Sequence, residues 1–471
     1  MKNIQTITDQ IFENYDSFKE KSITHRRFKH SNMLKILDKI KSNEKFNFEF
    51  VGKSVLGREL NLISTGKGKT KIFLWSQMHG NESTATMALF DIFNFFLDTS
   101  SLNDIKETIL NNLTLYFLPM VNPDGTELFQ RENIYNIDIN RDALALQTPE
   151  GRILMESFKK IEPVFSFNLH DQSILYSAGN THNPSTISFL APAYDKEKSL
   201  NPTREKSMRI IGALYKVLSK YIPACIARYS DEFEPRAYGD IFQSMGSSTI
   251  LIESGGSKND TEKQFIRKLN FFAILTALFI IADKYYEDIK LSLYEEIPYN
   301  EEKLFNTVLR NLTFKENEQN FSADIGIIME EINKTNGSGF YQKSEIGGIG
   351  DLSTFYGYEE YNLKGYEIVP GKTYSKKFKN INELSNTIVV NLLNQGYTNV
   401  VVEETEGRDF SPLPINILST RNEYKKNKIK TENPADFVIS KNGKINFTVI
   451  NGFFINLSKE IDTNINGRVY H

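Results

Sequence analysis

The sequence predicts an α/β domain, with a mixed, mostly parallel sheet covered by helices on both faces, and a smaller C-terminal α+β or β-rich domain. Short, fully apolar β-rich runs alternate with amphipathic helical patterns over residues 46–290. Continuous apolar strands of this kind are typical of a sheet that is buried on both faces. After residue 320 the composition changes to one rich in Gly, Asn and Lys with short strand patterns, which predicts the second domain.

The individual elements follow from the apolar pattern in chain order. Residues 1–45 are polar with helical spacing and predict an N-terminal helical arm. Within residues 46–290 we expect strands near 73–75, 113–121, 164–169 and 249–252, and helices near 82–93, 149–161, 204–221 and 263–286. Residues 291–320 are charged and polar and predict a connector, and residues 321–471 predict the accessory domain, with one helix near 382–393.

Composition narrows the classes of function. The formal net charge is −3, which gives no field that would attract nucleic acid or an anionic membrane, so we expect neither as a partner. The single cysteine, Cys225, excludes an intrachain disulfide and a thiolate metal site. The N-terminus has no apolar signal-peptide core, and the longest apolar stretch, 269–282, is shorter than the roughly 20 residues of a membrane span. These features predict a cytoplasmic protein and leave the oligomeric state open.

The six histidines carry the chemical signal. His79 and His170 each follow an apolar strand, Glu82 comes three residues after His79, and Glu253 ends another strand. A His-x-x-Glu pair with one distant His is the ligand set of a catalytic zinc, and a further carboxylate beside it can act as a general base. Ligands of open α/β sheets bind outside the carboxyl ends of the strands, where these groups and the Asn122-Pro-Asp-Gly125 turn are expected. The pattern predicts a metallohydrolase with one Zn²⁺ per chain.

These residues resemble the zinc carboxypeptidase family of metallopeptidases over roughly residues 46–285. The order of the elements agrees with the family's order as well. The motifs that carry the resemblance are Gly52-Lys-Ser-Val-Leu-Gly-Arg58, His79-Gly-Asn-Glu82, Asp138-Ile-Asn-Arg141, Leu169-His170 and Ile252-Glu253. The resemblance implies zinc-dependent hydrolysis of a peptide bond, with His79, Glu82 and His170 as metal ligands.

The resemblance also implies roles around the metal. Asp138 is expected to accept the second ring N–H of His79 and to fix its tautomer. Zinc lowers the pKa of its water to about 7, and Glu253 is expected to take the proton as that water attacks a carbonyl. Arg131 is expected to polarise the carbonyl and stabilise the oxyanion.

Substrate binding is expected to involve a second group of residues. The resemblance implies that Asn140 and Arg141 grip a substrate carboxylate, which favours removal of a C-terminal residue over internal cleavage. The loop 229–240 occupies the region where the family has a mobile tyrosine. Tyr229 and Tyr238 are both candidates; we favour Tyr238, with Arg236 as a further contact. His170-Asp171-Gln172 departs from the family's frequent His-Ser, so the floor near the metal is expected to differ.

Two other functions remain open at this stage. A deacylase of an N-acylated amino acid on the same fold would keep the zinc, Glu253 and the carboxylate clamp but cleave a small amide. A binding module with a degenerate site would use the C-terminal domain to engage a partner. The substrate is therefore expected to be a peptide or an acyl-amino acid. Its side-chain preference depends on loops that the sequence does not place.

Overall fold

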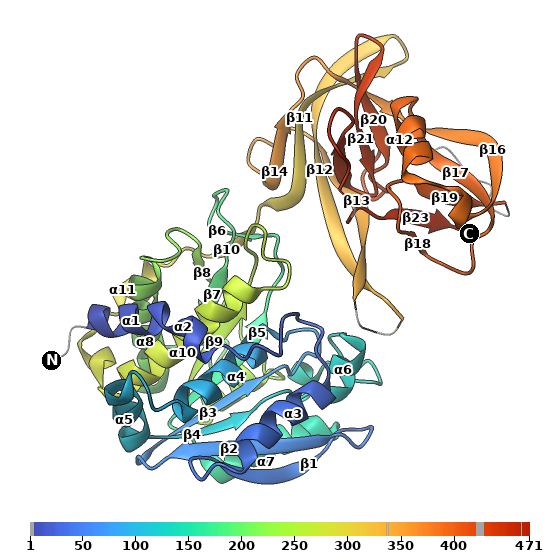
Figure 1. The fold of residues 1–471 in the computed structure, drawn as a ribbon. Coiled ribbons are helices and arrows are strands. Elements are labelled where there is room, and N and C mark those ends of the chain that lie inside the picture. Colours follow the sequence, from blue (N-terminus) through green and yellow to red (C-terminus); the bar gives the residue numbers. More distant parts are fainter. Residues whose placement is uncertain (1–3, 336, 338, 421–427, 463) are drawn as a thin grey trace. The chain divides into compact units, whose positions relative to one another are not determined.

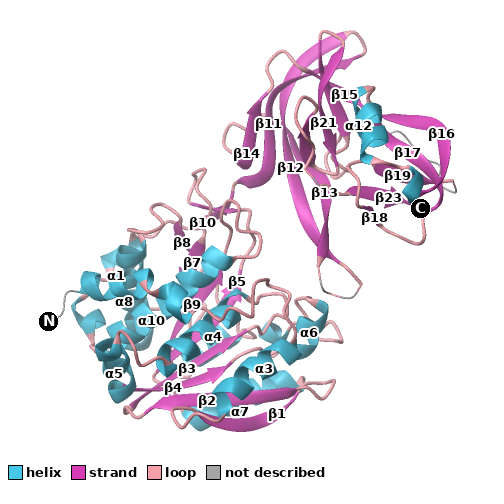
Figure 2. Cartoon of the chain, viewed as in Figure 1, coloured by secondary structure: helices cyan, strands magenta, loops and turns pink. Residues whose placement is uncertain are grey.

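The chain forms two compact units in the computed structural model, which describes residues 4–335, 337, 339–420, 428–462 and 464–471. The first unit ends at Glu302 and the second begins at Lys303 (Figure 1). Figure 2 shows that helices are concentrated in the first unit, whereas the second unit is mostly strand.

Unit 1 is built on an eight-stranded sheet with the order β1-β2-β4-β3-β5-β9-β7-β8. Its strands are β1 (Asn47–Lys53), β2 (Glu59–Gly66), β3 (Thr70–Ser76), β4 (Leu113–Leu118), β5 (Phe165–Asp171), β7 (Ile187–Leu190), β8 (Ile226–Arg228) and β9 (Ser248–Ser254). The central strands β4, β3, β5 and β9 are mutually parallel, and β1 and β2 pair antiparallel with their neighbours. Strand β7 pairs antiparallel with β9 and parallel with β8. The predicted mixed, mostly parallel sheet is confirmed. Outside it, β6 (Tyr176–Ala178) pairs with β10 (Asn300–Glu302).

Helices cover both faces of this sheet. They are α1 (Ile4–Glu13), α2 (Tyr15–Phe18), α3 (His30–Lys41), α4 (Thr84–Leu97), α5 (Asn103–Asn112), α6 (Pro123–Leu128), α7 (Pro149–Ile161), α8 (Pro202–Leu218), α9 (Tyr238–Ser244), α10 (Gln264–Ala282) and α11 (Ser292–Glu295). Because side chains alternate along a strand, Ile72 and Leu74 of β3 join the core under α4 and α10, whereas Phe73 and Trp75 join the core under α7 and α9. Each face therefore has its own hydrophobic core.

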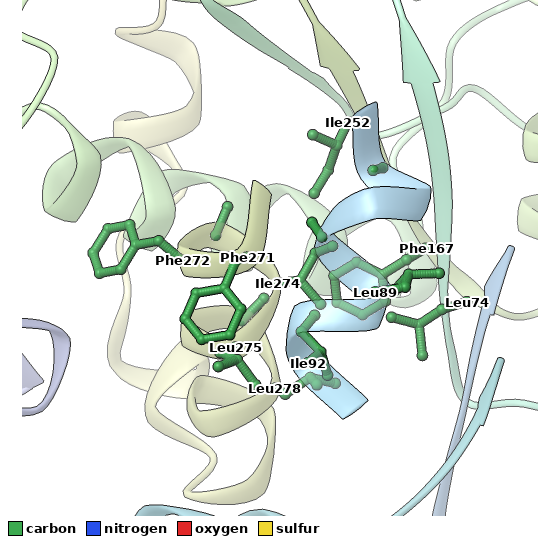
Figure 3. Close-up of a cluster of buried hydrophobic side chains, with 14 of the residues drawn as sticks. Leu74, Leu89, Ile92, Phe167, Ile252, Phe271, Phe272, Ile274, Leu275 and Leu278 are labelled. Atoms are coloured by element: carbon green, nitrogen blue, oxygen red, sulfur yellow. The ribbon is translucent and has the colours of Figure 1, made fainter. Parts of the chain in front are cut away.

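Helix α10 is a long, apolar helix of unit 1. By length and composition it could cross a membrane, but 89% of its apolar window is buried inside the fold. Figure 3 shows Leu275 and Leu278 of α10 against Ile92 of α4, with Leu74 and Phe167 of the sheet behind them. The prediction of a buried core helix for this stretch is confirmed.

A buried ion pair fixes the N-terminal helices to the core. Arg267 of α10 donates from Nε to Asp91 Oδ2 of α4 at 2.7 Å, and both side chains are fully buried. The same guanidinium donates to the carbonyls of Ile23 and Glu20 at 2.7 and 2.9 Å, and Tyr15 donates its hydroxyl to Asp91 at 3.1 Å. This buried polar cluster is one of the contacts that bind the predicted helical arm to the core.

In its described residues, unit 2 contains two sheets, one α-helix and a short 3-10 helix at Ile381–Glu383. The larger sheet comprises β11 (Leu304–Glu316), β12 (Gln319–Asn333), β13 (Phe340–Gly350), β14 (Tyr356–Asn362), β15 (Glu367–Pro370), β20 (Phe437–Lys441), β21 (Lys444–Ile450) and β22 (Phe453–Asn456). The smaller one comprises β16 (Lys372–Asn380), β17 (Tyr397–Glu404), β18 (Phe410–Ser411), β19 (Asn416–Ser419) and β23 (Gly467–Tyr470), with α12 (Asn386–Asn394) after β16. The expected β-rich C-terminal fold is confirmed.

The predicted connector over residues 291–320 is wrong. That segment contains α11, β10, all of β11 and the start of β12, and β11 pairs with β12 from Glu316↔Gln319 onward. The two turn residues between these strands, Asn317 and Glu318, have φ of 48° and 65°. Two-residue hairpins need this left-handed backbone, which is usually signalled by glycine. Neither position is glycine, so the sequence carries no hairpin signal at this turn, and its polar residues predict a linker instead.

Candidate metal centre

The chemical groups gather at one edge of the unit 1 sheet. The carboxyl ends of the parallel strands β4, β3, β5 and β9 lie side by side, and His170 of β5 pairs directly with Glu253 of β9. His79 follows β3 by three residues. After β4, the backbone N–H groups of Val121 and Asn122 donate to the carbonyls of Ser76 and Gln77, which ties the two strand ends together. Short connections from parallel strands therefore bring these groups to one place.

Three donor side chains converge there, as the sequence predicts. His79, Glu82 and His170 each offer one ligand atom, and these atoms lie within 4.8 Å of one another. Glu82 bridges the two rings, since Oε1 is 2.7 Å from His79 Nδ1 and Oε2 is 2.7 Å from His170 Nδ1. Donors bound to one zinc at about 2.0–2.2 Å lie roughly 3–3.6 Å apart, so small side-chain adjustments suffice. The donor set fits a zinc ion.

The protonation of these groups also suits a metal. Burial lowers the pKa of His170 and outweighs the charge of Glu82, which favours the neutral ring. Burial acts on Glu82 in the opposite direction, but the two imidazoles hold its pKa well below the usual range. Metal ligands must be deprotonated, and both groups meet this requirement.

His79 is oriented from behind by Asp138. The ring Nε2 lies 3.0 Å from Asp138 Oδ1, in the predicted contact, which leaves Nδ1 to face Glu82. Burial would lower the pKa of His79, but the charge of Glu82 and the bond to Asp138 raise it overall. Burial likewise opposes the charge of Asp138, and the bond from His79 outweighs it and lowers its pKa. A carboxylate behind a ligating imidazole fixes the tautomer.

The motif at residues 52–58 holds the turn after β4. Ser54 Oγ and Arg58 Nη1 donate to Asp124 Oδ1 at 2.8 and 2.7 Å, and the Leu56 N–H donates to Asp124 Oδ2 at 2.9 Å. Asp124 lies in α6, whose Gly125 backbone is so close to Gly80 that a Cβ on Gly80 would lie 2.2 Å from the Gly125 carbonyl carbon. The motif therefore supports the turn that carries the first two ligands.

Arg131 lies directly against this cluster. Its Nη1 donates to Glu82 Oε1 at 2.9 Å, and Nη2 donates to Asp138 Oδ2 at 3.1 Å. The side chain is 40% exposed, so one edge of the guanidinium faces the ligand atoms while the rest remains accessible. A fixed cation beside the ligand set can stabilise negative charge that develops on a bound carbonyl.

Glu253 lies beside the ligands but is not bonded to them. Its Oε2 is buried and has no hydrogen-bond partner among the described residues. Burial, followed by the charges of Glu82 and Asp171, raises its pKa well above the usual value. A divalent cation bound nearby would offset these negative charges and favour the carboxylate.

The predicted carboxylate clamp lies at the adjacent turn. Asn140 is buried, and its Oδ1 accepts from the Tyr238 N–H at 3.0 Å, which orients the amide. Arg141 is 40% exposed, with Nε 3.5 Å from Glu234 Oε2. Arg236 is more exposed and donates to both oxygens of Glu234, and these bonds lower the pKa of Glu234 to about 2. Arg141 and Arg236 thus share one counter-ion.

The structure contradicts the prediction that Tyr238 contacts substrate. Tyr238 begins α9 and turns into the core under α7, where its side chain is fully buried and its hydroxyl donates to the Gly151 carbonyl at 2.8 Å. Tyr229 is partly exposed and packs edge-on against Tyr176, with ring centroids 6.2 Å apart. Burial and then the charge of Glu253 raise the pKa of Tyr229. The Tyr229 N–H donates to the Phe189 carbonyl of β7, and β7 pairs with the end of β9 that carries Glu253. Tyr229 is the tyrosine that adjoins the site.

Two residues near the centre were missed. Lys263 donates to Asp171 Oδ2 at 3.0 Å, and Tyr176 flanks Tyr229. Asp171, directly after His170, was the one sequence signal for Lys263, because a buried carboxylate needs a partner. Nothing in the pattern around Tyr176 distinguishes it from a surface strand.

Comparison with known proteins agrees with this geometry. The sequence profile of the zinc carboxypeptidase family matches residues 33–258. A probable carboxypeptidase 2 of Arthroderma benhamiae is 25% identical over 265 residues, which are 54% of this chain and 47% of that protein. Carboxypeptidase B of Astacus astacus is 38% identical over 80 residues, 16% of this chain and 25% of its own. The chain thus spans about half the length, or less, of the curated relatives it matches.

Among solved structures, a metallo-carboxypeptidase from Burkholderia cenocepacia aligns with a TM-score of 0.45 and 15% identity, covering 55% of this chain and 70% of its own. The family profile covers all three donor residues, Arg131, Asp138 and Glu253, and it lies entirely within unit 1. Unit 1 is thus similar to the zinc carboxypeptidase family over residues 33–258, slightly less than half of the chain.

Proposed function

We propose that the chain hydrolyses peptide bonds with a zinc ion bound by His79, Glu82 and His170, and that it removes C-terminal residues. The observation that carries this proposal is the set of three donor atoms within 4.8 Å of one another, with Glu253 at the paired position of the neighbouring strand. The bound zinc would supply a Lewis acid and an acidified water.

Three further residues have separate roles in the proposed reaction. Glu253 Oε2 accepts the proton of the attacking water and returns it to the leaving amine, so the C–N bond breaks with the amine neutral. Arg131 donates from its accessible edge to the carbonyl oxygen as negative charge develops there. Asp138 keeps the His79 ring in one orientation throughout.

Zinc content is the most direct test. The purified chain is expected to bind about one zinc, because three buried ligand atoms converge at one point. Elemental analysis measures the stoichiometry, and removal of the metal with a chelator is expected to abolish hydrolysis until zinc is restored. Profiling with peptides and acyl-amino acids, with and without chelator, separates peptidase from deacylase. A chain that stays metal-free in added zinc and remains inactive would contradict the proposal.

The preference for a free C-terminus can be tested at Arg141. A hydrogen bond to a charged group contributes about 1.5–3 kcal/mol, so Arg141→Ala is expected to lower kcat/KM by roughly ten- to hundredfold on substrates with a free carboxylate beside the scissile amide. The same substrates with that carboxylate amidated should already be poor and should hardly change.

The matched control for this substitution is Arg152→Ala. Arg152 is an exposed arginine of α7 that donates only to the carbonyls of Leu146 and Gln147, so its loss should leave kcat/KM unchanged on both substrates. If Arg141→Ala weakened both substrates equally, Arg141 would serve the oxyanion or the fold, and the exopeptidase assignment would fail.

A further inference from the structure

Two buried, oppositely charged side chains lie beside the metal centre and take no part in the proposed reaction. Asp171 follows His170 at the end of β5, and Lys263 immediately precedes α10. Their side chains are 7% and 6% exposed, and Lys263 Nζ lies 3.0 Å from Asp171 Oδ2. Burying two charges is costly, and a buried pair generally gives no more stability than apolar residues of similar size. Stability alone therefore does not explain this ion pair, and its location beside the metal centre indicates its role.

The pair contacts all three segments that carry the metal centre. The Asp171 backbone N–H donates to Glu82 Oε2 at 3.1 Å, on the same oxygen that faces His170. Asp171 Oδ2 accepts from Thr84 Oγ1 at 2.6 Å, two residues after Glu82. Lys263 Nζ donates to the Ser254 carbonyl at 2.9 Å, next to Glu253.

These contacts form one chain of bonds. Lys263 joins the end of β9 to the end of β5, and Asp171 joins the end of β5 to the turn that carries Glu82. Each bond acts on a ligand itself or within two residues of a ligand or of the base. Partners of this kind, one bond removed from a metal ligand, typically change metal affinity or activity by about 10–100-fold when they are replaced.

We propose that Lys263 and Asp171 are positioning residues of the metal centre: their ion pair holds the Glu82 turn, the His170 strand end and the Glu253 strand end at fixed mutual distances. This inference rests on the proposed function, because it assumes that the three donors bind a metal. The pair neither binds the metal nor touches the substrate. Its role is to set the geometry of the groups that do.

The test uses the full-length chain with Asp171→Asn, Lys263→Met and the double substitution. Each single variant leaves one buried charge unpaired and is expected to lose folding stability, whereas the double variant is neutral and should recover most of it. Folding is followed by the fluorescence of Trp75, the single tryptophan, which is fully buried in unit 1.

The decisive readouts are taken on the metal itself and need no substrate. In the double variant, zinc affinity measured by chelator competition is expected to fall about 10–100-fold, and the absorption spectrum of the Co²⁺-loaded protein is expected to change, because the link between the strand ends is gone. On a cleaved peptide, kcat should fall by a similar factor while KM changes less than about twofold.

Lys106→Met provides the matched control. Lys106 is also a buried lysine, with a side chain 6% exposed and Nζ 2.7 Å from Asp98 Oδ2, but it lies on α5, away from the metal ligands. Its replacement should lower stability and leave the Co²⁺ spectrum, zinc affinity and kcat unchanged.

The outcomes separate the two proposals. A double variant with wild-type zinc affinity, Co²⁺ spectrum and kcat would overturn the positioning role and reduce the pair to a stabilising ion pair. Changes in Lys106→Met equal to those in Lys263→Met would overturn it as well. A wild-type chain that binds neither zinc nor Co²⁺ would overturn the proposed function, and the positioning role with it. A chain that binds both metals but cleaves no peptide would contradict the proposed activity alone.

Discussion

Replacement of Glu253 by glutamine is expected to lower kcat by about 10²–10⁴-fold while leaving zinc content unchanged, because glutamine keeps the shape of the side chain but cannot accept a proton. Glu253 is not among the three converging donors, and its Oε2 has no bonding partner within the described part of the chain. The carboxylate is therefore available for proton transfer. Measurements of kcat and KM on a cleaved peptide, with elemental analysis of the same samples, test this expectation.

The control for Glu253→Gln is the same change at Glu156. Glu156 lies on the exposed side of α7, so its replacement should alter neither turnover nor metal content. Loss of zinc from Glu253→Gln would make Glu253 a ligand and would contradict its assignment as the base. Turnover within about tenfold of the wild type would require another base.

The location of the site could be predicted because each of its main residues follows a strand in the sequence. His79, His170 and Glu253 needed only the rule that parallel strands present their carboxyl ends at one edge, and the structure places β3, β5 and β9 side by side. The contact of Asp138 with His79 could not come from this rule, because Asp138 follows no strand and lies in the segment between α6 and α7. It came from the family resemblance.

The incorrect or missing site residues are those whose role depends on the direction in which a side chain points. Tyr229 and Tyr238 lie in one loop region, and the sequence does not reveal that α9 begins at Tyr238 and turns its ring into the core. The partner of Asp171 was equally hidden, since Lys263 is 92 residues away and adopts a left-handed backbone with φ of 50°. Alternation and helical periodicity carry no information about such loop conformations.

The boundary between the two units was predicted incorrectly because β11 is rich in polar and charged residues. Strand β11 contains apolar residues, and Leu309 and Leu312 are fully buried, yet the charged and polar residues around them indicated a linker. Strands of antiparallel sheets can keep one polar face, so polarity alone does not exclude them. The two units divide at Glu302 and Lys303, between β10 and β11.

The largest expected effect on stability lies in the cluster that fixes the N-terminal helices. Asp91→Ala is expected to lower the free energy of unfolding of unit 1 by about 3–5 kcal/mol, because it leaves the Arg267 guanidinium buried without its counter-ion. The loss also removes the acceptor for Tyr15 and for the Glu20 N–H. Since Trp75 is the single tryptophan and is buried in unit 1, urea unfolding followed by its fluorescence reports on this unit alone.

The control for Asp91→Ala is a substitution in an exposed ion pair. Lys160 and Glu49 have side chains 62% and 48% exposed, so Glu49→Ala should change the free energy of unfolding by less than about 1 kcal/mol. Asp91→Leu combined with Arg267→Met should recover part of the loss, because two apolar side chains leave no unpaired charge. The carbonyls of Ile23 and Glu20 would still lack the donor that Arg267 provides, so recovery should be incomplete. Equal small losses for Asp91→Ala and Glu49→Ala would mean that the N-terminal helices are fixed by apolar packing and not by the buried pair.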